Sequence, residues 1–211
     1  DYPFEVIPID LSSHFDGDLV ANPGHIENDS IDGGTGFFVV EGYDGGSSGN
    51  ALVQGFPADG VVGLHRLADY SGPNAIYFRP GRTGSVRVEV PARRYSVLRF
   101  LTASGRGDAL RPVDLVYSDG SSERRVLHFH DWFDDPGPGG ERGGPSTPDT
   151  RPVLNGMDRL SNGFFEDAND PALFETTLTV DSRKDLVAFV LEGWEFDPDG
   201  STTPARIFPA R

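Results

Sequence analysis

Short runs of β-forming residues, separated by glycine and proline, restrict the possible folds of this chain more than any other feature. The 211 residues include 27 glycines and 17 prolines, well above the average combined usage of about 12%. No apolar stripe of helical period extends beyond about two turns. Successive strands joined by turns predict an all-β, two-sheet antiparallel β-sandwich of the jelly-roll type. The predicted strands are Phe4–Leu11, Gly36–Glu41, Val61–Leu67, Asn74–Phe78, Ser85–Val90, Tyr95–Ala103, Val113–Tyr117, Arg124–Phe133, Leu173–Val180, Asp185–Trp194 and Ala205–Phe208.

One hairpin is especially clear. Two β-type runs flank Asp119-Gly120, a dipeptide that reaches the positive φ angles of a tight turn at low cost. The second run alternates, so His128, His130 and Trp132 are expected on one face. We expect the end of this strand to form the rim of any binding site.

Two other runs are apolar almost throughout, which predicts strands that are covered on both faces. They are Leu186–Leu191 and the run that begins at Tyr95. By contrast, Ser85–Val90 alternates cleanly, so Arg87 and Glu89 should face water. We find no internal repeat and predict one domain over residues 1–211.

The charge balance narrows the possible partners. The net charge of −15 repels phosphate backbones, which argues against nucleic acid and anionic membranes as partners. No apolar run approaches the roughly 20 residues of a membrane span. Cysteine is absent, which excludes disulfides, thiolate metal ligands and a cysteine nucleophile. Acidity of this kind also simply keeps a protein soluble.

A long segment at about 134–160 interrupts the strand pattern. It is rich in glycine, proline and polar residues, and loops of this length are usually either functional or disordered. Because it directly follows Trp132, we predict a long loop that either folds over the rim or stays free of any ligand.

His128 and His130 have the i, i+2 spacing that lets two imidazoles on a strand reach one metal ion. No histidine follows His130, so a three-histidine site would need another ring from far along the chain, from His14, His25 or His65. The alternative interpretation is a pair of surface or hydrogen-bonded histidines.

Aspartate-rich turns offer oxygen ligands of the kind that Ca²⁺ prefers. Asp16 and Asp18 flank a glycine in one such turn, and Asp197 and Asp199 lie in another. Neither completes a twelve-residue EF-hand loop, and the same residues are also good turn formers. We predict a structural calcium ion, with these four aspartates as candidate ligands.

Sequence signatures of catalysis are lacking. Glu192 and Glu195 point to opposite faces of a regular strand, so they cannot flank one glycosidic bond. No serine-nucleophile elbow, Walker loop or dinucleotide-binding loop is present. We therefore predict no catalytic residues and favour a binding protein over an enzyme.

Several segments together resemble the galactose-binding-like β-sandwich of secreted bacterial proteins, the type appended to glycoside hydrolases as a carbohydrate-binding module. The similarity is strongest over residues 50–135 and is carried by Phe56–Gly60, Gly72–Ile76, Tyr95–Leu101, Val116–Ser121 and Asp131-Trp132. The resemblance implies a secreted or cell-surface module, appended to a larger protein, that binds a polysaccharide or glycan.

The leading hypothesis is therefore non-catalytic glycan binding at a loop rim. Trp132 and Trp194 would stack on sugar rings, and His130, Asp134 and Arg159 would hydrogen-bond hydroxyl groups. One alternative is a metal-dependent jelly-roll enzyme centred on His128 and His130. Another is an adhesive or scaffold domain of a cell-surface protein.

Overall fold

Strands make up almost all of the regular structure. The computed structural model describes residues 5–21, 31, 36–39, 51–58, 61–78, 84–105, 107–132, 150–154, 158–161, 164–166, 171–193 and 205–208. Within these ranges the only helical element is a single 3₁₀ turn, Ser12–His14. The same ranges contain no helix that is long and apolar enough to cross a membrane. The predicted all-β class is confirmed.

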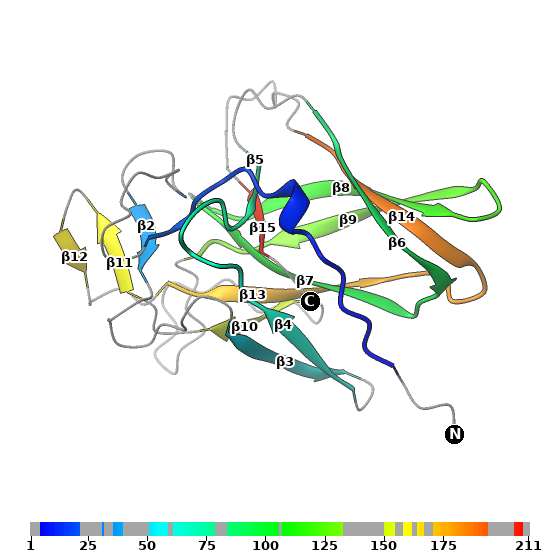
Figure 1. Cartoon of the computed structure of the whole chain (residues 1–211), viewed down its shortest axis with the longest axis horizontal. Coiled ribbons are helices and arrows are strands. Elements are labelled where there is room, and N and C mark those ends of the chain that lie inside the picture. Colours follow the sequence, from blue (N-terminus) through cyan, green and yellow to red (C-terminus); the bar gives the residue numbers. More distant parts are fainter. Residues whose placement is uncertain are drawn as a thin grey trace.

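A four-stranded antiparallel sheet forms one layer (Figure 1). Its order is β6 (Val86–Arg94), β14 (Asp185–Leu191), β8 (Ala109–Tyr117) and β9 (Ser122–Phe129). In β6 the valines are buried, whereas Arg87 and Glu89 are exposed, as the alternation predicts. In β14 only part of the apolar run is covered, because Val187 and Val190 stay partly exposed.

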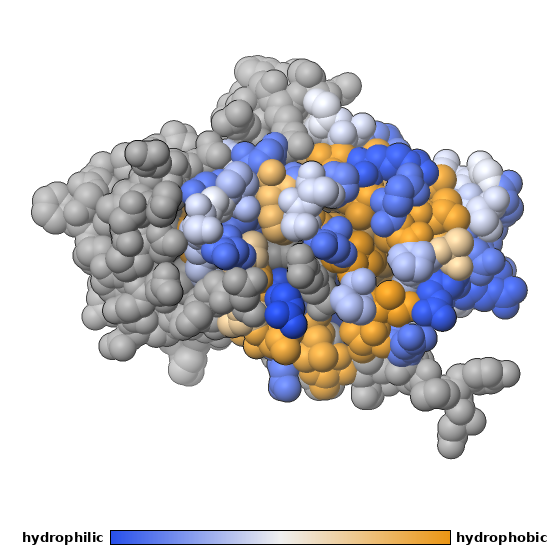
Figure 2. All heavy atoms as spheres, viewed as in Figure 1, coloured by the Kyte–Doolittle hydropathy of each residue, from blue (hydrophilic) through white to orange (hydrophobic). Residues whose placement is uncertain are grey.

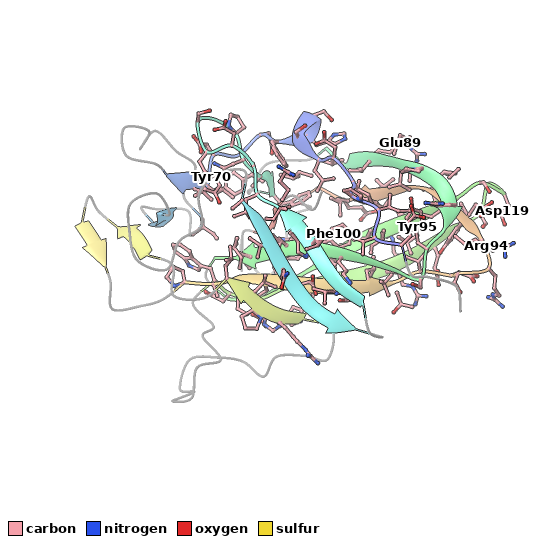
Figure 3. The ribbon with its side chains drawn as sticks, turned by 60° about the horizontal axis from the view of Figure 1, so that its bottom comes forward. Tyr70, Glu89, Arg94, Tyr95, Phe100 and Asp119 are labelled. Atoms are coloured by element: carbon pink, nitrogen blue, oxygen red, sulfur yellow. The ribbon has the colours of Figure 1, made fainter. Side chains whose placement is uncertain are left out.

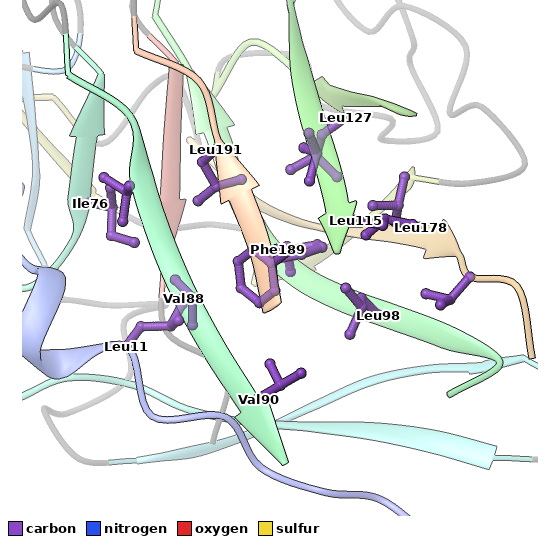
Figure 4. Packing of buried hydrophobic residues seen from close by; sticks show 14 of the residues in the cluster. Leu11, Ile76, Val88, Val90, Leu98, Leu115, Leu127, Leu178, Phe189 and Leu191 are labelled. Atoms are coloured by element: carbon purple, nitrogen blue, oxygen red, sulfur yellow. The ribbon is translucent and has the colours of Figure 1, made fainter. Parts of the chain in front are cut away.

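A five-stranded sheet packs against this layer. Its order is β10 (Thr150–Leu154), β13 (Leu173–Thr179), β7 (Val97–Ser104), β15 (Ala205–Phe208) and β5 (Ile76–Phe78). The main core lies between the two sheets. There the rings of Phe100 and Phe189 meet edge to face, with centroids 5.4 Å apart. Figure 4 shows Leu98 and Leu178 facing the same interior. The structure is thus a β-sandwich, while the jelly-roll topology stays a prediction.

The hairpin of β3 (Leu52–Ala58) and β4 (Val61–Arg66) adds a third layer on the other face of the five-stranded sheet (Figures 1 and 3). Alternate residues of β7 therefore enter different cores. Leu98 and Phe100 join the first, and Leu101 and Ala103 join a second cluster with Val53 of β3. This confirms that the run after Tyr95 is covered on both faces.

A smaller sheet comprises β1 (Val20–Ala21), β2 (Gly36–Val39), β11 (Asp158–Ser161) and β12 (Phe164–Glu166). Its β1–β2 pair is parallel, and its other pairs are antiparallel. Figure 1 shows β2, β11 and β12 at one end of the molecule, away from the β8–β9 turn.

Two predictions about secondary structure are wrong. Residues 5–11 form no strand, although Ile7, Ile9 and Leu11 pack against the main core. Pro8, which lacks an N–H group, interrupts any ladder there. In addition, β10 and part of β11 lie within the segment predicted as a loop at 134–160. Pro152 in β10 is tolerated because β10 is an edge strand. Residues 134–149 and 155–157 of that segment lie outside the described ranges.

Candidate metal centre

The β8–β9 hairpin brings Asp108 to the two histidines. Its loop contains Gly120 at φ 82°, and the ladder pairs Ala109 with Phe129 and Leu110 with His128. Asp108 directly precedes β8 and His130 directly follows β9, so both lie at this end of the ladder. Ala109 and Phe129 are buried in the core, so the next pair, Leu110 and His128, points to the outer face of the sheet, whereas His130 lies past the end of β9 and is buried.

Asp108, His128 and His130 form a compact group. One ligand atom from each lies within 4.8 Å of the others. The Asp108 Oδ2 atom is 2.9 Å from His128 Nε2 and 3.5 Å from His130 Nδ1. The imidazole centroids are 4.2 Å apart and the rings are tilted by 39°. In the part of the chain that the structure describes, this is the only such group of three or more acidic or histidine side chains.

Backbone contacts hold the Asp108 carboxylate in place. The Asp131 N–H donates to Asp108 Oδ1 at 2.9 Å, which leaves Oδ2 directed at the histidines. The Asp131 carboxylate in turn accepts a hydrogen bond from the Gly107 N–H. Gly107 has φ 108°, a conformation that other residues rarely adopt. These two hydrogen bonds join the loop before β8 to the chain that follows β9.

The other sheet supports the two histidines. Thr176 of β13 donates its hydroxyl to the His128 carbonyl at 2.9 Å. The ring of Phe174, also in β13, lies 5.1 Å from the His130 ring. At the end of β9, the Ser104 N–H donates to the His130 carbonyl at 2.7 Å, and the Trp132 N–H donates to the Ser104 carbonyl at 2.8 Å. The group thus lies where the two sheets meet.

The three side chains differ in exposure. Asp108 is 39% exposed and His128 24%, whereas His130 is 2% exposed. Burial lowers the pKa of His130 below its ordinary value, and the nearby His128 adds to this shift, while Asp108 opposes it. The lowered pKa favours the neutral imidazole, which is the form that binds metal ions.

The expected exposure of Trp132 is wrong. Trp132 is 1% exposed and belongs to the second apolar cluster, so neither face of its indole is open to a sugar. The chain leaves β9 at Phe129 and turns inward by way of the hydrogen bonds to Ser104. His130 is also buried, although it lies beside the more exposed Asp108.

The other proposed glycan contacts are not assembled at this site. Trp194 and Asp134 lie outside the described residues. The backbone of Arg159 lies in β11, opposite Phe38 of β2, within the smaller sheet.

The first aspartate turn has a structural role. Asp16 Oδ1 accepts a hydrogen bond from the Tyr77 N–H at 2.8 Å. Asp18 Oδ1 accepts one from the side-chain amide of Asn74 at 2.6 Å, and Asn74 Oδ1 accepts the N–H of Leu19 at 2.9 Å. These contacts attach the N-terminal segment to the start of β5. Asp197 and Asp199, the other predicted calcium ligands, lie outside the described residues.

Sequence reasoning found the histidine pair and missed its carboxylate. Asp108 stands 20 residues before His128, and the only signal for it is the register of the hairpin. Of the distant histidines considered as third ligands, His14 lies in the 3₁₀ turn and His25 is outside the described ranges. His65 belongs to a different cluster.

That second cluster lies between β3–β4 and the five-stranded sheet. Glu175 of β13 contacts His65 Nε2 at 2.6 Å through Oε2, and Arg99 of β7 at 3.0 Å through Oε1. The side chains of His65 and Glu175 are 1% and 3% exposed. Its position between layers, with two basic groups on one carboxylate, is typical of a structural ion pair.

Comparisons with known proteins do not assign the chain to a family. Neither a scan against protein-family models nor a search of curated proteins gives a match. The resemblance to carbohydrate-binding modules therefore stays a prediction, and the functional argument depends on the residues themselves.

Proposed function

We propose that this β-sandwich binds one divalent transition-metal ion through Asp108, His128 and His130. The observation that carries the proposal is the convergence of one carboxylate and two imidazoles, with ligand atoms within 4.8 Å of one another. Two histidines and one carboxylate are a recurrent ligand set of zinc and non-haem iron sites.

The spacing of the ligand atoms fits such an ion. Bonds of about 2.0–2.1 Å to a tetrahedral metal set its ligand atoms roughly 3.3 Å apart. The separations from Asp108 Oδ2 to the two histidines, 2.9 and 3.5 Å, lie on either side of this value. These separations fit a bound ion, and the backbone contacts of Asp108 and His128 do not involve the Asp108 Oδ2 atom or the imidazole nitrogens.

The donor set also argues for a particular class of metal. Imidazole suits zinc, iron, copper and nickel, whereas Ca²⁺ requires six to eight oxygen ligands. Two of the three donors here are nitrogens. Calcium binding at the aspartate turns stays a prediction, separate from this site.

Three protein ligands leave a coordination position for water or another molecule. The exposure of Asp108 and His128 places the accessible side of the group toward solvent, while His130 closes the inner side. A metal ion held there would act as a Lewis acid and would lower the pKa of bound water. The hydrogen bonds from the Asp131 N–H to Asp108 and from the Thr176 hydroxyl to the His128 carbonyl would hold two of the ligands in position.

Metal titration tests the proposal. Protein stripped with a chelator is titrated with Zn²⁺ in a calorimeter at pH 7.5. We expect one ion per chain for the wild type. In His128→Ala and Asp108→Asn the affinity should fall at least about 100-fold, because loss of a ligand costs more than the 10–100-fold typical of a supporting contact.

His14→Ala is the matched control, since this histidine lies outside the group and its loss should leave Zn²⁺ binding unchanged. Circular dichroism of each variant checks the fold. The proposal is wrong if the wild type takes up no stoichiometric metal, or if His128→Ala and Asp108→Asn bind Zn²⁺ as tightly as the wild type does.

Glycan binding stays a prediction in its own right. The described residues give it less support than the metal centre, because Trp132 is buried. A glycan array with the wild-type protein tests it directly, and its outcome is independent of the zinc titration.

A further inference from the structure

The metal centre is one end of a continuous row of side chains on the outer face of β8 and β9. Opposite residues of an antiparallel pair share a face, so every second pair of the register points outward. From the metal centre toward the turn, the outward pairs are Leu110 with His128, Pro112 with Val126, and Asp114 with Arg124. We call this row the outer ladder.

The middle of the outer ladder is apolar and open to water. Leu110 is 62% exposed and Val126 57%, and they are two of the six large hydrophobic residues exposed in the described ranges. Both lie within two pairs of the metal centre, at about 6.6–6.8 Å per pair. Single exposed apolar side chains are common on proteins. Here two neighbouring apolar side chains form a strip that leads away from the open coordination site.

The far end of the outer ladder is occupied by an ion-paired arginine. Arg124 donates to both oxygens of Asp114, at 2.9 and 3.1 Å, and also contacts Glu192. The positive charge of Arg124 is thus matched by two carboxylates, so this end offers no anion site. The apolar strip therefore extends from the Leu110–His128 pair to the charged Asp114–Arg124 pair, over roughly 13 Å.

The size of the strip decides between a macromolecule and a small molecule. A specific protein interface buries at least about 1,000 Å², far more than two exposed side chains provide. A ligand with a short hydrocarbon chain covers the strip without further contacts. The protein's net charge of −15 disfavours polyanions, whereas a bound divalent cation attracts a single anionic oxygen group.

We infer that the strip formed by Leu110, Pro112 and Val126 binds the apolar tail of an amphiphilic small molecule whose oxygen-bearing head occupies the open metal position. This inference rests on the proposed metal centre and specifies the class of ligand that it takes. The head group binds as an anionic oxygen donor, and the tail lies along the outer ladder toward Arg124.

A chain-length series tests the inference on Zn²⁺-loaded protein. Acetohydroxamate and octanohydroxamate carry the same metal-binding head and differ only in the tail. We expect octanohydroxamate to bind the wild type at least about tenfold more tightly, because each buried methylene adds affinity. In the double variant Leu110→Gln, Val126→Thr, the ratio should fall below threefold while the Zn²⁺ affinity stays unchanged.

Leu52→Gln is the matched control, since Leu52 is 60% exposed but lies on β3, and its loss should keep the wild-type ratio. Equal affinities for the two hydroxamates at full zinc occupancy would overturn this inference and leave the proposed metal centre standing. So would a ratio that persists in the double variant. If the wild type binds no Zn²⁺, the proposed function itself fails, and the inference fails with it.

Discussion

Glu175 shows how much a single buried carboxylate contributes to this fold. It accepts contacts from Arg99 of its own sheet and from His65 of the β3–β4 hairpin, so it joins two layers. In the same strand, Phe174 and Thr176 contact the metal centre on the opposite face. Three successive residues therefore link the hairpin, the sheet and the histidine pair.

We predict that Glu175→Ala lowers the free energy of unfolding by about 3–5 kcal/mol, because it leaves buried basic groups without their carboxylate. Urea denaturation measures the loss. Glu89→Ala is the control, since Glu89 is paired with Arg87 at the surface with its side chain 68% exposed. This change should cost less than about 1 kcal/mol. Equal losses in the two variants would contradict the structural role of Glu175.

The candidate site was only partly predictable at the level of single residues. Alternation along one strand is a local property, so the shared face of His128 and His130 followed from their spacing. The role of Asp108 depends on pairing across the hairpin, and one residue of slip would turn it to the other face. The burial of Trp132 depends on hydrogen bonds to Ser104 of a different sheet, for which the sequence carries no local signal.

Among the elements, the β3–β4 hairpin has the tightest packing requirement. Gly55 and Gly63 face Glu175 so closely that a methyl group on either would overlap the carboxylate. Small residues at these two positions allow the hairpin to approach the sheet. The outer face of the hairpin carries Leu52, Val62 and Leu64, each at least 40% exposed. Figure 2 shows an apolar patch at the edge where Figure 1 places this hairpin.

Gly55→Ala should destabilise the protein by about 1–3 kcal/mol, because the added methyl group forces Glu175 or the hairpin to shift. Gly84→Ala is the control, since a methyl group there meets nothing within 4 Å and should change stability by less than about 0.5 kcal/mol. Thermal denaturation of both variants gives the comparison. A Gly55→Ala protein as stable as the control would show that the hairpin does not pack as closely as the structure indicates.

Some strands were predictable from their own residues and others were not. Val86–Arg94 begins with alternating valines and Leu173–Thr179 is rich in β-forming residues, and both were expected within a few residues of their ends. Leu52–Ala58 contains Gly55 and Pro57, which act against a regular strand, and its ladder has a register shift there. Strand β10 is stabilised by pairing with β13 rather than by its own sequence.

At the scale of the whole molecule, the sandwich followed from the repeated runs and the absence of helical period. The third layer could not be predicted, because an apolar run indicates that both faces of a strand are covered but does not identify the covering element. The run after Tyr95 indicated such a strand, and the covering element proved to be a hairpin of which only one strand, Val61–Arg66, was predicted.

The pH dependence of global stability provides a further prediction. The lowered pKa of His130 means that the unfolded chain takes up a proton at about pH 6.5, before the folded protein does. In the absence of metal, the free energy of unfolding should therefore fall as the pH drops below about 6.5. Urea denaturation at pH 7.5, 6.5 and 5.5 should show a smaller fall for His130→Gln than for the wild type. If the free energy of unfolding falls equally in the two proteins, the lowered pKa of His130 is contradicted.

The position of β7 in the middle layer also affects how the chain assembles during synthesis. Its partner β13 follows much later, with Phe174 standing 72 residues after Thr102, and its other neighbour β15 follows later still. The β8–β9 hairpin can close as soon as it leaves the ribosome, whereas both edges of β7 stay unpaired until β13 and β15 have been made. Such non-local pairing slows folding, so we expect nascent chains that end before β13 to depend on chaperones.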